Sequence, residues 1–315
     1  MRRLLLTLAM IAFALPTSAQ TYPDRPITMI VPFAAGGSSD ASARLIAEEM
    51  GKVLGQRIVA ENVAGAGGAT GLTRAARAAP DGYTIFIGNS GTNAAVYWLH
   101  DNLSFTPDSF VPIGLVAKSY SLIAVRKDFP GATLADFVAA AKKAPGTLRL
   151  GHAGVGSQNF LICRALQRAA GIDVVLVSYR GAGPALNDLM GGHVDGVCDA
   201  GTSLAQPIRA GTVRALAVAA PNRIPTLPDV PTSAEAGLPA FQLQSWNALF
   251  APRGTPPQVI ATLNAALRKA AASDFVRNRY TELTAAPGEP DELAPEFVTP
   301  LVVRDIARFK DLLKE

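Results

Sequence analysis

Four glycine-rich loops hold most of the residues in this sequence that could do chemistry. They read FAAGGSSD at residues 33–40, GNSGTN at 88–93, GHAGVGSQN at 151–159 and SYRGAGPA at 178–185. Each combines glycine with small residues and at least one hydroxyl, and the first contains no lysine, arginine or histidine. Glycine lets a ligand approach the backbone, and free N–H groups at a helix start bind anions. Together the loops indicate a small anion held by amides and hydroxyls, and a carboxylate fits best.

Turn geometry is the alternative explanation for any one of these loops, because short turns often contain glycine and serine. The recurrence of one composition in four loops favours ligand binding. A dinucleotide fits less well, because GAGGATG at residues 65–71 has Thr70 in place of the last glycine of G-x-G-x-x-G, although it fits the looser G-x-G-x-x-x-G. No tyrosine has a lysine four residues on, as a short-chain dehydrogenase would need, and no phosphate-binding G-x-x-x-x-G-K-[ST] occurs. We therefore expect no cofactor.

A serine hydrolase is the enzyme alternative. The second loop reads G-N-S-G-T, which differs from the nucleophile elbow G-x-S-x-G only in having Thr92 where the last glycine belongs. Ser90 would then be the nucleophile of an exported hydrolase, and His193, preceded by Asp173 or Asp188, is formally available as its partner. His193 lies in GGHVDG, a turn before a strand, where a surface histidine is the simpler interpretation. We expect a protein that is not an enzyme.

The loops must be positioned by alternating strands and helices. Short apolar runs predict strands at 27–32, 57–61, 83–88, 122–126, 147–151, 174–178, 194–199, 214–219 and 246–250. Apolar residues at helical spacing predict helices at 40–54, 69–79, 134–143, 158–170, 184–190, 256–272 and 295–313. Strands separated by such helices predict parallel α/β sheets, whose ligands bind beyond the carboxyl ends of the strands. Four prolines punctuate residues 221–237, which we expect to form a long structured loop.

The start of the chain, MRRLLLTLAMIAFALPTSAQ, has the pattern of a secretory signal peptide. Two arginines precede an apolar run from Leu4 to Leu15, which is too short to span a bilayer, and small residues follow it. We expect cleavage after Ala19 and an exported, soluble mature chain. Loss of the two arginines lowers the formal charge from +4 to +2. This near-neutral balance, without a basic stripe that carries aromatic residues, argues against nucleic acid as a partner.

The cysteines and histidines do not form a metal-binding pattern. Cys163 and Cys198 lack companions at zinc-site spacing, and the histidines at 100, 152 and 193 share no ligand spacing. We expect no metal site. In an oxidising compartment the two cysteines could form a disulfide, but their spacing does not decide whether they do.

Several longer stretches give the sequence a family resemblance. They are YPDRPITMIVPFAAGGSSD, ENVAGAGGATG, AAPDGYTIFIGNSGT, GHAGVGSQN, YRGAGPALNDLMGGHVD, IRAGTVRALAVAAPNRIPTLPDVPTSAEAGLP and SWNALFAPRGTP. In this order and spacing they resemble the extracytoplasmic solute-binding proteins of the tripartite tricarboxylate transporter family (Bug or TctC type). The resemblance covers essentially the whole mature chain.

The resemblance implies an α/β fold of the two-lobed Venus-flytrap, type II-like class, in which each lobe is a mostly parallel sheet flanked by helices. It implies a monomeric periplasmic receptor that captures a small carboxylate for the permease subunits of the transporter. A ligand sensor that presents the same closed form to a signalling partner is the alternative role. The expected division is a signal peptide at 1–19, a discontinuous first lobe at 20–122 and 248–315, and a second lobe at 123–247.

The resemblance also places the site, with a ligand carboxylate held by the first and second loops, partly through ordered waters. The first lobe would contribute Phe33, Ala34, Ala35, Gly36, Gly37, Ser38, Ser90 and Thr92, and the second lobe would close with Gly156, Ser157, Gln158, Asn159, Tyr179 and Asp199. Asp40, in the first turn of a helix, has a structural role in this scheme.

The sequence departs from the family at the distal end of this site. Relatives commonly have Gly-His-Leu where this chain has Gln158, Asn159 and Phe160, and the sequence around Asp199 reads VCDAGT, which ends in Thr202. These neutral hydrogen-bonding groups, with Phe33 as an apolar wall, suit a second carboxylate or an aromatic ring. Both ligand types stay open at this point.

Overall fold

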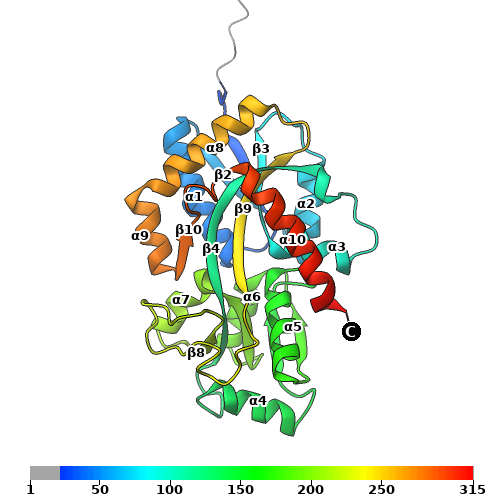
Figure 1. Cartoon of the computed structure of the whole chain (residues 1–315), viewed down its shortest axis with the longest axis vertical. Helices are drawn as coiled ribbons and strands as arrows, with labels where there is room; N and C mark the ends of the chain where they lie inside the picture. Colours follow the sequence, from blue (N-terminus) through cyan, green and yellow to red (C-terminus); the bar gives the residue numbers. More distant parts are fainter. Residues whose placement is uncertain (1–21, 315) are drawn as a thin grey trace, which may run out of the picture.

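Two units of three parallel strands form the centres of the fold. The computed structural model describes residues 22–314 (Figure 1). One unit has the order β2 (Ile58–Asn62), β1 (Ile27–Val31) and β3 (Thr84–Asn89), and the other has the order β6 (Val175–Ser178), β5 (Arg149–His152) and β7 (Gly196–Ala200). β1 is apolar except for Thr28, because helices cover both of its faces.

Two long antiparallel strands connect these units. β4 (Phe110–Arg126) and β9 (Gln244–Pro252) run side by side between the upper and lower parts of Figure 1. Residues 110–120 of β4 pair with β9, whereas residues 121–126 pair with β7 and with β8 (Val213–Val218). The prediction of a strand limited to 122–126 was therefore too short, because Pro112, Gly114 and the polar stretch at 118–121 interrupt the apolar pattern that precedes it.

The helices divide between the two units. We call β1–β3, β9, residues 110–120 of β4 and β10 (Ala285–Pro287) with their helices the first lobe, and β5–β8 with their helices the second lobe. The first lobe contains α1 (Ser38–Leu54), η1 (Ala66–Gly68), α2 (Ala69–Ala76), the π-helical turn η2 (Gly91–Ala95), α3 (Val96–Leu99), η3 (Pro107–Ser109), α8 (Pro257–Ala272), α9 (Asp274–Glu282) and α10 (Pro295–Leu313). The second contains α4 (Leu134–Lys143), α5 (Gln158–Ala170), α6 (Ala182–Met190) and α7 (Gly201–Arg209). The exact division at residues 122 and 248 stays a prediction.

Each lobe has its own hydrophobic core. In the first lobe, Ile46 and Met50 lie one turn apart on α1 and pack with Leu263 of α8 over the central strands. In the second lobe, Leu161 and Leu166 of α5 pack against β5 and β7. These rigid cores fix the strand ends that carry the four loops.

Three helices, α3, α7 and α9, were not predicted. α3 has only four residues, α7 contains Pro207, which argues against a helix interior, and α9 is mostly polar. α7 packs on β4 and α1, and α9 packs on α1 as well as on its chain neighbours α8 and β10, so tertiary contacts stabilise both. By contrast, the predicted helices at 134–143, 158–170 and 295–313 have the bounds of α4, α5 and α10.

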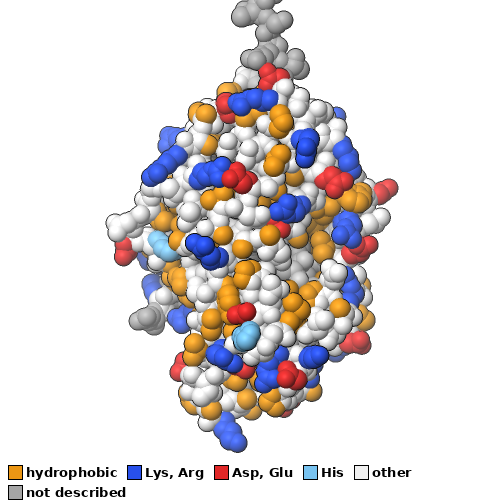
Figure 2. Space-filling model, turned by 180° about the vertical axis from the view of Figure 1, so that it is seen from behind, with side chains coloured by type: hydrophobic (Ala, Val, Ile, Leu, Met, Phe, Trp, Pro, Cys, Tyr) orange, Lys and Arg blue, Asp and Glu red, His pale blue; other side chains and the backbone are white. Residues whose placement is uncertain are grey.

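The outer surface is polar and mixed in charge. On the face shown in Figure 2, lysines and arginines are scattered among acidic side chains. Within residues 22–314, no helix combines the length and the apolar character that a membrane crossing requires. The predicted signal peptide lies outside the described residues.

Candidate ligand site between the lobes

The carboxyl ends of the parallel strands of each lobe face the other lobe. α1, α5, α6 and α7 begin directly after β1, β5, β6 and β7, so their N-termini meet at this interface. β1 and β3 are neighbours in the first lobe, and the chain leaves their carboxyl ends in opposite directions across the sheet. β5 and β7 are related in the same way in the second lobe. Such switch points form the ligand crevice of open α/β sheets. The loops predicted to bind the ligand are therefore brought together here.

Glycines allow the two lobes to touch backbone to backbone. A Cβ atom on Gly91 would lie 2.3 Å from the Gln158 nitrogen, one on Gly67 would lie 1.8 Å from the Val155 oxygen, and one on Gly183 would lie 2.2 Å from the Ala35 oxygen. The Ala34 N–H also donates to the Arg180 carbonyl at 3.1 Å. The structure is thus a closed form. These glycines serve contact between the lobes. Two of them, Gly91 and Gly183, lie in loops whose glycines were predicted to let the ligand approach the backbone.

A buried polar cluster supports the first-lobe side of the interface. The Ser39 hydroxyl accepts hydrogen bonds from the Asn89 amide at 3.2 Å and the Asn247 amide at 3.1 Å. The Asn89 oxygen accepts from the N–H groups of Gly91 and Thr92 at 2.9 and 3.0 Å, which shapes the second loop. The sequence analysis missed these three residues as site residues. Ser39 and Asn89 lie inside the quoted loops, whereas Asn247 comes from β9 and gave no signal.

The start of α1 presents free backbone donors. Its N-cap residue, Gly37, has no capping side chain, and no described protein group accepts from the N–H groups of Ser38 and Ser39. Asp40 instead accepts from the Gly36 N–H at 3.1 Å and pairs with Arg44 at 2.9 Å. Burial alone would raise the pKa of Asp40, but hydrogen bonds from Arg44, Asn62 and Gly36 lower it. Asp40 therefore stays charged and structural, and the helix N-terminus remains available to an anion.

The second-lobe side contains buried donors that lack partners. Ser157 caps α5 by accepting from the Phe160 N–H at 3.2 Å, and the Asn159 amide donates to the Cys198 carbonyl at 3.0 Å. In contrast, the amide nitrogen of Gln158 and the hydroxyl of Thr202 are buried without a hydrogen-bond partner among the described residues. Leaving such a group unpaired costs about 1–3 kcal/mol. A ligand that supplied partners would recover that free energy.

Asp199 is a buried titratable group on the second-lobe side. Its carboxylate accepts from the Ala200 N–H at 2.7 Å and from the Ser203 hydroxyl, both at the start of α7. Burial raises the pKa of Asp199 to about 6, even though these hydrogen bonds act in the opposite direction. In the described chain no lysine or arginine is buried, and none forms an ion pair with Asp199.

Asp199→Asn should remove a pH-dependent destabilisation of the ligand-free protein. Because the pKa of Asp199 is raised from 3.8 to about 6, its ionisation opposes folding progressively as pH rises through this window, and fully above it. The shift corresponds to about 3 kcal/mol at most. Relative to the wild type, the variant's free energy of unfolding should therefore increase between pH 4 and pH 7. Urea unfolding at both pH values measures this difference, and a gap independent of pH would contradict the raised pKa.

The other predicted residues occupy different depths. Phe33 packs with Ala153 and Ala182 across the lobe interface, and Ser90 and Thr92 are buried. Six others lie at the helix starts described above: Gly37, Gly156, Ser157, Gln158, Asn159 and Asp199. The remaining first-loop residues are partly or fully exposed: Ala34, Ala35, Gly36 and Ser38. The Tyr179 hydroxyl donates to Asp188 at 2.6 Å, and Tyr179 lines a groove of about 740 Å³ between the lobes. The structure does not bring this hydroxyl to the buried polar cluster.

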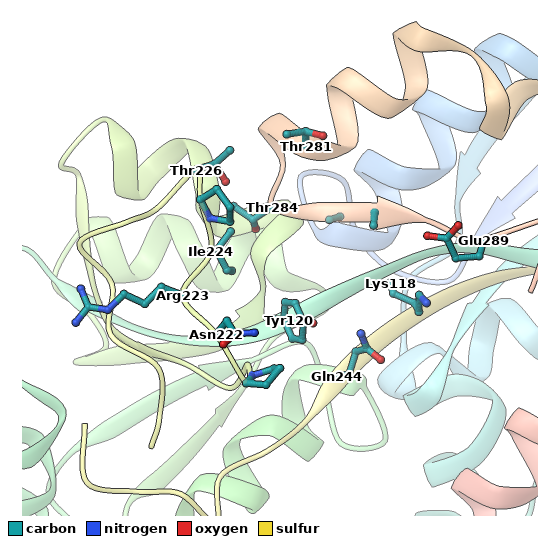
Figure 3. A pocket seen from close by; sticks show the side chains of 14 residues that line it. Lys118, Tyr120, Asn222, Arg223, Ile224, Thr226, Gln244, Thr281, Thr284 and Glu289 are labelled. Atoms are coloured by element: carbon teal, nitrogen blue, oxygen red, sulfur yellow. The ribbon is translucent and has the colours of Figure 1, made fainter. Parts of the chain in front are cut away.

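A second cavity lies away from these helix starts, beside the connecting strands β4 and β9. It measures about 420 Å³ and is lined by Lys118, Tyr120 and Gln244 of β4 and β9, with residues 221–226 and 281–289 around them (Figure 3). Lys118 pairs with Glu292 at 2.6 Å, and Arg223 at the rim pairs with Glu235 at 3.0 Å. Its cations are already neutralised and no helix begins among its lining residues, so this cavity is a poorer match for a carboxylate than the interface between the lobes.

The remaining reactive residues do not assemble into a catalytic or metal centre. In the described chain no histidine is hydrogen-bonded to Ser90, His193 is exposed, and no group of three metal-ligating side chains occurs. Cys163 and Cys198 are both buried and both carry free thiols.

Comparison with known proteins decides the family. The sequence model described as the tripartite tricarboxylate transporter family receptor matches residues 42–299. This chain belongs to that family. The receptors of this family are solute-binding proteins and not enzymes, so the hydrolase alternative is wrong.

Solved structures of family members have the same fold. MatC from Rhodopseudomonas palustris with bound malate is 42% identical with a TM-score of 0.90, covering 93% of this chain and 100% of MatC. The periplasmic binding protein BugD is 38% identical with a TM-score of 0.88, covering 92% and 97%. The R. palustris protein Rpa4515 with adipate is 32% identical with a TM-score of 0.88, also covering 92% and 97%. The expected two-lobed periplasmic-binding-protein fold is confirmed.

Proposed function

We propose that this receptor captures a small di- or tricarboxylate between its lobes in the periplasm and delivers it, as a monomer, to the permease subunits of a tripartite tricarboxylate transporter. The supporting observation is that helix N-termini from both lobes, of which that of α1 is uncapped, meet beside buried donors without partners, in a described chain where no lysine or arginine is buried. Malate and adipate, bound to two relatives, are dicarboxylates. The same chemistry suits this site.

Binding would proceed in two steps. A ligand carboxylate first meets the free N–H groups at the start of α1 and the second loop, and the second lobe then rotates about β4 and β9 until Gln158, Asn159 and Thr202 cover the other end. Contacts made only in the closed form shift the population toward it, and the permease recognises that shape. No specific contact favours the sensor alternative over delivery to a permease.

A thermal-shift panel tests the ligand class. We expect a dicarboxylate or tricarboxylate at a hundred times its Kd to stabilise the protein by about 2.7 kcal/mol. This corresponds to a rise in Tm of about 5 °C. The panel contains mono-, di- and tricarboxylates and an aromatic carboxylate, with amino acids and sugars as controls. If all carboxylates leave Tm unchanged while a sugar raises it, the proposal is wrong.

A further inference from the structure

Thr284 has a strained backbone conformation at the junction of the two lobes. It connects α9 to β10 and has a φ of 55°, in the left-handed region that β-branched residues rarely adopt. In the described chain, Ala66 is the only other non-glycine residue with a positive φ. The Thr284 N–H donates to the Thr281 carbonyl at 3.0 Å, and the next residue, Ala285, pairs with Ser119 of β4. Such a conformation persists only where its surroundings impose it, and it is typical of functional sites.

The Thr284 side chain meets the second lobe at Gly201. Gly201 is the first residue of α7, and a Cβ atom on it would lie 1.7 Å from the Thr284 hydroxyl oxygen and 3.0 Å from the Thr284 Cβ. The hydroxyl therefore occupies the space where a side chain at residue 201 would begin. Thr284 is only 5% exposed, and its hydroxyl has no hydrogen-bond partner among the described residues. Burying a hydroxyl without a partner is unfavourable, and the contact that covers this one is made between the lobes.

The surroundings of Thr284 leave room for it to relax when the lobes part. Thr284 lines the cavity of about 420 Å³ beside β4 and β9, together with residues 221–226, which follow β8 (Figure 3). In an open form the hydroxyl would move away from Gly201 and bond with water, and the segment before β10 would have this space for a less strained conformation. The cost of the strained backbone and the cost of the unpartnered hydroxyl therefore both fall on the closed form.

We propose that Thr284 is a positioning residue that sets the balance between the open and closed forms of the receptor. Its strain and its buried hydroxyl destabilise the closed form, so the empty receptor stays open and closes when a ligand supplies the free energy. A receptor whose binding form is a minor one binds its ligand more weakly in proportion to that fraction. This inference rests on the proposed function, because it concerns the closure that captures the ligand, but it does not depend on which carboxylate binds.

Thr284→Gly tests the proposal, because glycine adopts a positive φ freely and carries no hydroxyl. In small-angle scattering, the empty variant should be more contracted than the empty wild type. In calorimetry with malate and adipate, the ligands of two solved relatives, we expect the variant to bind about 10- to 30-fold more tightly. Thr284→Ala, which removes the hydroxyl and keeps Cβ, should tighten binding about fivefold. Thr147→Gly, the same replacement in an exposed turn of the second lobe, should change neither measurement.

A rescue experiment separates this role from a merely structural one. Gly201 does not have a positive φ, so Gly201→Ala fits the backbone, but its methyl group would overlap the Thr284 hydroxyl in the closed form. We expect Gly201→Ala to weaken binding about 10- to 100-fold. Adding Thr284→Gly removes the overlapping hydroxyl and leaves the backbone oxygen of residue 284 at 3.2 Å, so the double variant should regain most of the lost affinity.

The outcomes separate this inference from the proposed function. Wild-type scattering and affinity in Thr284→Gly, or a double variant that binds as weakly as Gly201→Ala, would overturn the role of Thr284 while carboxylate binding stands. Failure of every carboxylate in the thermal-shift panel refutes the proposed function itself. In that case the scattering of the empty wild type and the empty Thr284→Gly variant still decides whether Thr284 opposes closure, since it needs no ligand.

Discussion

Gly91→Ala is expected to lower ligand affinity about 100-fold while the first lobe stays folded. The added methyl group would lie 2.3 Å from the Gln158 nitrogen and 2.7 Å from the Gly156 oxygen, both backbone atoms of the other lobe. Gly91 does not have a positive φ, so alanine fits its conformation. The clash therefore exists only when the lobes are closed. Overpacking of this kind costs about 1–3 kcal/mol, which is up to about 100-fold in affinity.

Calorimetry and small-angle scattering measure this effect together. The wild type should contract when it binds the ligand found in the thermal-shift panel, and Gly91→Ala should not. Gly183→Ala, which places its methyl 2.2 Å from the Ala35 oxygen, repeats the test from the second lobe. Gly191→Ala is the matched control, because its methyl meets only groups of the same lobe, the His193 ring at 3.1 Å and the Asn187 oxygen at 3.4 Å. Wild-type affinity in both interface variants would show that the closed form described here is not the binding form.

The glycine loops show how far sequence reasoning reaches at this site. Their position after strands and before helices was predictable, because apolar periodicity and turn residues are local signals. Their partners were not, because the contact of Gly67 with Val155 joins residues far apart in the sequence. The sequence reading therefore explained the glycines by ligand approach, whereas several of them let the lobes approach each other.

The supporting residues of the site show the same limit. Asn247 contacts Ser39 only because β9 crosses from the second lobe back into the first, beside β3. Similarly, α7 brings Ser203 to Asp199, although Pro207 within α7 argues against a helix there. Tertiary contacts override weak local preference in such segments. The family resemblance supplied Asp199 as a site residue, but the groups that donate hydrogen bonds to it and its burial come from the fold.

The absence of buried lysine and arginine in the described chain has an electrostatic consequence. Charge on the ligand must be stabilised by N–H dipoles and neutral side chains, which are oriented by the fold and do not carry a full charge. Such a site tolerates added negative charge poorly, because nothing in it can neutralise the addition. Asn89 is the position where this consequence is best tested, since an isosteric acid can keep most of its contacts.

Asn89→Asp should therefore weaken carboxylate binding strongly while the protein stays folded. One carboxylate oxygen can still accept from the N–H groups of Gly91 and Thr92, and the Ser39 hydroxyl can rotate to donate to the other. The new charge would lie in the second loop beside the ligand. At about 5 Å and an effective dielectric constant of about 20, like charges repel by about 3 kcal/mol, or about 100-fold in affinity.

The control is Asn187→Asp, an exposed change on α6 that adds the same net charge away from the interface. It should bind like the wild type in calorimetry, while thermal unfolding shows that both variants are folded. Asn89→Ala adds the contrast of lost hydrogen bonds without charge, and we expect it to lower stability more than Asn89→Asp but to weaken binding less at pH 8. If Asn89→Asp binds the carboxylate as well as the wild type does, the second loop lies away from the anion. In that case the first-lobe half of the site has to be sought at the start of α1 alone.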